Sequence, residues 1–183
     1  MRYKILAIII LVSFILISFA SAQDKEQKEF SQNSEKWWLS AGIGGSHFGP
    51  CFSGGFTYNY NNSLFTVRYF QADEFNFNVE GQYDQPSLTC KEFGFLYGMS
   101  YVKNHGSLSL SAGISYVSGT DRGNLIAYHQ FESINISTLG IPFEAKFRIN
   151  IIGSIGVGGS WFGNINSTKS YTGGMFEISA GVL

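Results

Sequence analysis

Apolar and polar residues alternate with a period of two along most of the chain after residue 36. The stretch LGIPFEAKFRIN at 139–150 shows it clearly, with apolar residues at one parity and Glu144, Lys146 and Arg148 at the other. Successive side chains of a β-strand point to opposite faces, so such runs predict strands. We expect eight of them, at 37–46, 51–60, 63–71, 90–102, 106–118, near 134 to 150, 152–163 and 171–183.

The connections between these runs alternate in length. Three are tight, two are long and two are intermediate, and the tight ones follow even-numbered strands. An up-and-down barrel with both termini at its tight-turn end has this alternation. The tight turns are 61–62, 103–106 and 150–151, the long loops are 72–89 and 119–132, and the intermediate ones are 46–50 and 164–170.

The two faces of the predicted strands differ in an unusual way. One carries bulky Phe, Tyr, Leu and Ile, whereas the other is mainly Gly and Ser with a few charges. Gly is depleted in strands, so a water-exposed face of this kind is unexpected. A transmembrane barrel explains it, because its apolar face meets lipid and small residues fill a narrow lumen. Aromatic residues near strand ends predict an interfacial girdle: Trp37, Trp38, Tyr58, Tyr60, Tyr101 and Trp161.

The charged residues of the polar face would then point into the lumen. Three acids and three bases fall at this parity, and buried charge is costly unless it is paired. The sequence therefore predicts a salt-bridge network inside the barrel, made of Arg68, Glu92, Glu144, Lys146, Arg148 and Glu177.

The N-terminus has the features of a secretory signal peptide. Arg2 and Lys4 precede the apolar run 5–17, and an A-x-A site ends at Ala22. We expect three parts: a cleaved signal peptide at 1–22, a flexible periplasmic leader at 23–36 and a barrel domain at 37–183. Without Arg2 and Lys4 the chain has 10 basic and 13 acidic residues, a net charge of −3. No basic patch suggests nucleic-acid binding.

Cys51 and Cys90 are the only two cysteines. Export to an oxidising compartment would permit a disulfide between them. The alternative is two separate free thiols, and the sequence alone leaves both open.

The chain resembles the small outer-membrane β-barrel proteins of Gram-negative bacteria, of the OmpA transmembrane-domain and OmpX-like type. The strand LGIPFEAKFRIN is also similar to a strand of PorT-like outer-membrane barrels. The final run GGMFEISAGVL is similar to the terminal assembly signal of such proteins, with Gly173, Phe176 and Ile178 at the matching spacing, although it ends in Leu183 instead of an aromatic residue. The resemblance covers about 37–183 and implies an outer-membrane location.

We expect a non-enzymatic, monomeric outer-membrane protein with a plugged lumen, in contact with membrane lipid, whose loops 72–89 and 119–132 could bind a protein partner. One alternative is a lipid-modifying enzyme, with His129 beside Asp121 or Glu132 as an acid–base pair. The other is a soluble, lipocalin-like barrel with the apolar face inside. No residue spacing predicts a nucleophile, a metal site or a cofactor site.

Overall fold

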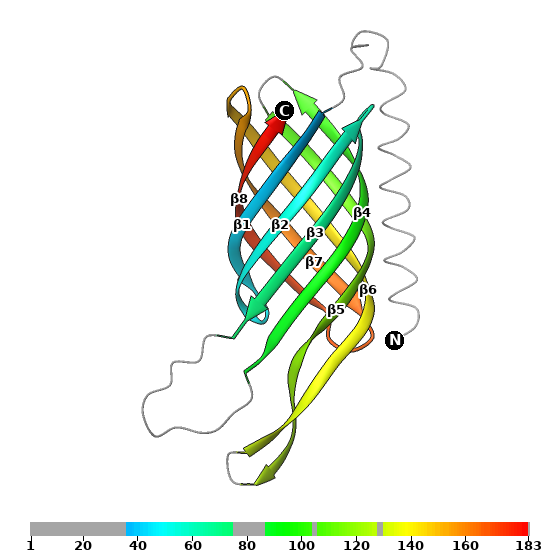
Figure 1. Cartoon of the computed structure of the whole chain (residues 1–183), viewed down its shortest axis with the longest axis vertical. Coiled ribbons are helices and arrows are strands. Elements are labelled where there is room, and N and C mark those ends of the chain that lie inside the picture. Colours follow the sequence, from blue (N-terminus) through cyan, green and yellow to red (C-terminus); the bar gives the residue numbers. More distant parts are fainter. Residues whose placement is uncertain (1–35, 75–86, 104–105, 128–129, 183) are drawn as a thin grey trace. The chain divides into compact units, whose positions relative to one another are not determined.

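The computed structural model describes residues 36–74, 87–103, 106–127 and 130–182. Eight antiparallel strands follow one another around a closed barrel (Figure 1). The predicted signal peptide and nearly all of the predicted leader lie outside these residues, as does Leu183. None of the described residues form a helix able to cross a membrane. The strands are β1 Lys36–Ser46, β2 Gly49–Tyr60, β3 Ser63–Asp73, β4 Thr89–Lys103, β5 Gly106–Ala127, β6 Gln130–Ile152, β7 Ile155–Asn166 and β8 Tyr171–Val182.

Strand β1 closes the barrel by pairing on both of its edges. Leu39 lies opposite Phe56 of β2 on one side and Ala180 of β8 on the other. Closure leaves no open edge within the barrel wall, which pairs the backbone groups that lipid could not satisfy. The predicted eight-stranded, antiparallel, up-and-down barrel is confirmed.

The barrel has two different ends. The turn end holds the first and last residues of the wall, since Trp37 pairs with Val182, and also the β2–β3 turn. Asn61 and Asn62 have φ angles of 49° and 65° in that turn, as type I′ hairpins require at both central residues. The loop end holds the β3–β4 and β5–β6 connections, and there the hairpin of β5 and β6 extends beyond the other strands (Figure 1).

The alternation of side chains is as predicted. In β3, Phe65, Val67 and Tyr69 are exposed on the outside, whereas Thr66 and Arg68 are buried inside. The same inversion holds around the wall, so the outside is a continuous belt of large apolar side chains. A soluble ligand-binding barrel of lipocalin type would need the opposite arrangement, which argues against that alternative.

The predicted long loop 119–132 is largely wrong. β5 continues to Ala127 and β6 begins at Gln130, so most of this segment is a hairpin that extends beyond the wall. Its Gly, Asn and charged residues suggested a loop, but the β5–β6 register set within the barrel carries on past it. Register shifts occur only near its tip, after Arg122. Alternation of Phe75, Phe77 and Val79 with Asn predicts an extension of the third strand above the membrane, but residues 75–79 lie outside the described residues.

Two predicted turns also differ. The turn expected at 150–151 lies instead at Gly153 and Ser154, because β6 runs through the β-branched Ile151 and Ile152. Gly153 has a φ of +26°. The connection expected at 46–50 is only two residues long, between Ser46 and Gly49. The rule that longer loops follow odd strands therefore fails at β1.

Candidate functional site

The middle of the lumen holds a chain of alternating charges. Arg68 Nη2 lies 2.6 Å from Glu92 Oε1, and Arg68 Nη1 lies 2.9 Å from Glu144 Oε2. Lys146 Nζ lies 3.0 Å from Glu144 Oε1 and 2.7 Å from Glu177 Oε2. We call these five residues, Arg68, Glu92, Glu144, Lys146 and Glu177, the lumen network. It joins β3, β4, β6 and β8 across the interior.

Glu92 receives two further donors from the opposite wall. Asn164 Nδ2 donates to Glu92 Oε2 over 2.6 Å, and the Tyr171 hydroxyl donates to the same oxygen. Asn164 also donates to the Ser115 hydroxyl over 2.7 Å. Gly140 makes room for this amide, since a Cβ there would lie 2.1 Å from Asn164 Oδ1. Both oxygens of the buried Glu92 carboxylate are thus hydrogen-bonded, as burial of a charge requires.

Between the lumen network and the loop end lies an aromatic cluster. Phe70 packs against Phe162 with ring centroids 5.0 Å apart and stacks on Tyr171 at 5.2 Å. Phe48 meets Tyr171 edge-on at 5.6 Å, and Met175 belongs to the same buried group. We call these residues, Phe48, Phe70, Phe162, Tyr171 and Met175, the loop-end cluster. It also contacts Cys51, Ala72, Cys90 and Val117.

Cys51 and Cys90 are both buried, and the structure has them as free thiols. Ala72 lies between them, paired with Cys51 on β2 and with Cys90 on β4. Two strand spacings separate their backbones by about 9.5 Å, whereas a disulfide needs Cα atoms within about 7 Å. The closed barrel therefore keeps the two thiols apart.

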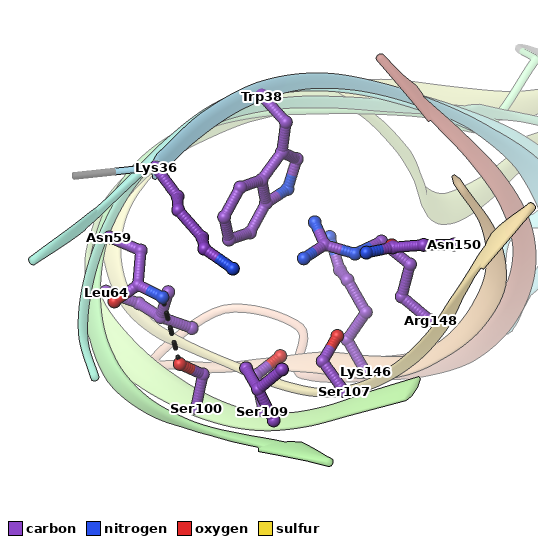
Figure 2. Close-up of a pocket in the computed structure, with 11 residues that line it drawn as sticks. Lys36, Trp38, Asn59, Leu64, Ser100, Ser107, Ser109, Lys146, Arg148 and Asn150 are labelled. Atoms are coloured by element: carbon purple, nitrogen blue, oxygen red, sulfur yellow. Dashed lines mark hydrogen bonds between the residues drawn. The ribbon is translucent and has the colours of Figure 1, made fainter. Parts of the chain in front are cut away.

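The turn end of the lumen has a different character. A cavity there is open at its centre, with Trp38, Lys36, Arg148 and Asn150 around it (Figure 2). The guanidinium carbon of Arg148 lies 3.9 Å from the centre of the Trp38 ring, in a cation–π contact. We call this cavity the turn-end pocket. It is lined by Lys36, Trp38, Asn59, Leu64, Ser100, Val102, Ser107, Ser109, Lys146, Arg148 and Asn150.

The six charged residues predicted for the lumen do not all form ion pairs with one another. Five form the lumen network, but Arg148 makes no ion pair with any described residue and stacks on Trp38 instead. Trp38 was expected in the outer girdle beside Trp37. That prediction is wrong for Trp38, which is 5% exposed and faces inward, whereas Trp37 is 43% exposed. Neighbours in a strand face opposite sides, so only one of the two could lie outside.

Sequence reasoning missed the residues that complete the lumen. Asn164, Tyr171, Phe70 and Phe162 were not singled out. A signal existed for two of them, because Phe70 and Phe162 share the parity of the polar residues Arg68 and Ser160. An aromatic residue on the small, polar face of such a strand indicates lumen packing.

The proposed acid–base pair has no geometric support in the described residues. Asp121 is bound to Lys169, whose Nζ lies 2.9 Å from Asp121 Oδ1. His129 and His105 lie outside the described residues, and His47 sits in the β1–β2 turn beside Phe48. No group of three or more His, Cys, Asp and Glu side chains gathers in the part of the chain that the structure describes.

Several solved outer-membrane barrels share this fold. The N-terminal β-barrel domain of OprF from Pseudomonas aeruginosa matches 82% of this chain and 99% of its own, with a TM-score of 0.58 and 10% identity. Neisserial surface protein A matches 83% and 99%, with a TM-score of 0.52 and 13% identity. Ail from Yersinia pestis, in complex with the heparin analogue sucrose octasulfate, matches 81% and 97%, with a TM-score of 0.52 and 16% identity.

These likenesses establish the transmembrane-barrel fold. At such low identity they do not assign the chain to the OmpA, OmpX or PorT-like families individually. No protein-family model matches the sequence, and no curated protein matches it.

Proposed function

We propose that this chain is an integral protein of the bacterial outer membrane that acts as a monomer, through its loop-end surface and not as a channel or an enzyme. One observation carries the proposal: the barrel is apolar outside and packed with paired charges and aromatic rings inside. An apolar outer belt requires lipid. The buried loop-end cluster and the lumen network leave no wide aqueous path through the middle of the lumen.

The membrane location can be tested with two matched substitutions on β5. Ile114 is 72% exposed on the wall, and Ile126 is 69% exposed on the hairpin beyond it. A lysine facing lipid costs about 2–4 kcal/mol near the bilayer midplane but about 0–1 near the interfaces. We expect Ile114→Lys to lower the temperature of the heat-shift transition on gels of extracted outer membranes, and Ile126→Lys to leave it unchanged.

If the barrel were surrounded by water, both isoleucines would be exposed to the same solvent. Equal changes in the heat-shift temperature for the two substitutions would therefore contradict the membrane assignment. Recovery of the wild-type protein in the soluble fraction, with no shift on boiling, would contradict it directly.

The loop-end hairpin is the surface that we propose for partner binding. On its β7 side, β6 has no strand partner among the described residues before Gly140, which pairs with Asn166. Free strand edges can add a strand from another protein. The hairpin also exposes Leu125 and Ile126. The predicted partner loop 72–89 contributes four acids and no base, which argues against a polyanionic ligand such as the one bound by Ail.

A photo-crosslinking side chain at Asn135, on the free edge of β6, would test this proposal in intact cells. We expect a discrete protein adduct at that position. A crosslinker at Trp161, on the lipid-facing wall, is the matched control and should give none. The absence of an adduct at Asn135, or identical adducts at both sites, would rule out this edge as the binding surface.

A further inference from the structure

The guanidinium group of Arg148 is buried, and some of its N–H donors lack a hydrogen-bond acceptor in the described part of the chain. Arg148 is 8% exposed, and its Nε and Nη1 atoms have no hydrogen-bond acceptor among the described residues. Its guanidinium carbon lies 3.9 Å from the centre of the Trp38 ring, whose face attracts the charge but accepts no hydrogen bond in the guanidinium plane. Unsatisfied donors on a buried charged group are costly. The side chain points into the turn-end pocket (Figure 2).

The lining of the turn-end pocket is one-sided in charge. It includes Lys36, Lys146 and Arg148 and no carboxylate. Lys146 is neutralised by Glu144 and Glu177. Glu177 attracts Arg148 through space, but its ion pair is with Lys146. Arg148 and Lys36 therefore face the cavity without an ion pair to any described residue.

We propose that the turn-end pocket is a binding site for a small oxyanion, a carboxylate or phosphate group, with Arg148 as its main ligand. The Trp38 ring covers one face of the Arg148 guanidinium. The N–H groups along the edge of the guanidinium plane are therefore free to donate to the anion. Guanidinium groups suit such anions because their parallel N–H donors match two oxygens. Lys36 supplies a second charge, and Ser107, Ser109 and Asn150 supply neutral polar groups at the rim.

Two sources can provide this group. One is a free anion that enters from the turn end of the barrel. The other is the chain itself, since residues 23–35 carry four acids directly before Lys36: Asp24, Glu26, Glu29 and Glu35. In both cases Arg148 binds an oxyanion group. A variant whose leader carries no acidic residues distinguishes the two sources.

The test is an NMR titration of the full mature chain in detergent with inorganic phosphate, at constant ionic strength. The signals followed are the Trp38 indole N–H and the Arg148 Nε–H. We expect saturable shifts with a dissociation constant on the order of 1–10 mM. Arg148→Gln should weaken binding by about tenfold or more, since it removes the charge and the fork. Arg148→Lys keeps the charge and should weaken it by roughly threefold to tenfold.

Lys91→Gln is the matched control, because Lys91 is an exposed lysine near the loop end and its loss changes the net charge equally. It should alter the affinity by less than about twofold, since solvent screens charges at that separation. The neutral-leader variant is D24N/E26Q/E29Q/E35Q. Phosphate affinity equal to wild type identifies a free anion as the occupant. Clearly tighter binding in this variant identifies a leader carboxylate as the competing occupant.

Two results would overturn the proposal. One is the absence of saturable shifts in both the wild type and the neutral-leader variant. The other is an affinity in Arg148→Lys and Arg148→Gln equal to that of the wild type. If Arg148→Gln fails to give the folded band on a heat-shift gel, the Arg148→Lys comparison decides.

Discussion

The two ends of the lumen are built from the same eight strands but have opposite chemistry. Toward the loop end the inward positions hold Phe70, Phe162 and Met175, which belong to one buried hydrophobic cluster. Toward the turn end they hold Asn59, Ser100 and Ser107, which line an open cavity. The lumen network lies between these regions. The period-two pattern is identical in both, so the size and polarity of the inward side chains alone decide whether the barrel is packed or hollow.

This contrast indicates that the two ends of the lumen have different roles, one in stability and the other in binding. The loop end resembles the core of a soluble protein, where close packing stabilises the fold. The turn end is packed less completely, and two nitrogen atoms of Arg148 lack a hydrogen-bond acceptor among the described residues, which is typical of a binding site. Substitutions at the boundary and at each end should therefore have different consequences.

The largest effect is expected at the boundary, from Arg68→Met. This change leaves Glu92 and Glu144 without their shared partner, and an unpaired buried charge costs about 3–5 kcal/mol. The free energy of unfolding, measured in lipid with guanidinium, should fall by this amount. The variant R68M/E92Q/E144Q removes the stranded charges as well and should recover most of the loss. A triple variant as unstable as Arg68→Met would show that shape, not charge, governs the network.

A loss of about 3 kcal/mol is expected from Phe162→Ala in the loop-end cluster. Phe162 is fully buried, and removal of its ring leaves a cavity. Phe176→Ala is the control on the outer wall, where the ring is 79% exposed and lipid fills the space. It should cost markedly less. Conductance across a planar bilayer should rise only for Phe162→Ala. Equal losses in the free energy of unfolding for Phe162→Ala and Phe176→Ala would mean that the loop-end cluster stabilises the barrel no more than the outer apolar belt does.

At the turn end, Trp38→Leu should cost about 1–2 kcal/mol. The substitution keeps an apolar side chain but removes the cation–π contact with Arg148, which is strong when the pair is buried. Trp38→Phe retains an aromatic face and should recover part of the loss. The neighbouring Trp37→Leu leaves Arg148 untouched. If it weakened phosphate binding as much as Trp38→Leu, the assignment of the pocket to the inward tryptophan would be wrong.

The smallest effect is expected above the wall, at the ion pair of Asp121 and Lys169. Asp121 lies beyond Thr120, the last β5 residue that pairs with β4. Partial burial disfavours its charge, but the hydrogen bonds from Lys169 and from the Arg122 amide, with the nearby positive charges, lower its pKa below the ordinary 3.8. The stabilisation is therefore present above pH 3.8 and lost as the pH falls through the lower folded-state pKa.

For such a partly exposed pair we expect less than about 1 kcal/mol. The free energy of unfolding of Asp121→Asn should approach that of the wild type as the acid limit is reached. Lys169→Gln also removes the contact of Lys169 with the Phe48 ring, so part of its loss should persist in acid. A gap between wild type and Asp121→Asn that stays constant with pH would show that the carboxylate charge is not the source of the effect.

Local alternation was sufficient to predict most of the architecture. It predicted the number of strands, the inverted faces and the inward position of Arg68, Glu92, Glu144 and Glu177, because a strand places each side chain by its parity alone. The contacts among these charges could not be predicted. Arg68 on β3 meets Glu144 on β6 only because the strands are staggered around a closed barrel, and that stagger is a property of the whole sheet.

The sequence by itself determined that this protein is a barrel with an apolar exterior and a charged interior. Only the tertiary structure decided which tryptophan of the pair faces Arg148, that β5 and β6 continue beyond the wall, and that one end of the lumen is packed while the other is open. The physical reason is the sequence separation of the interactions. Side-chain alternation depends on neighbouring residues, whereas register, stagger and packing depend on contacts between strands far apart in the sequence.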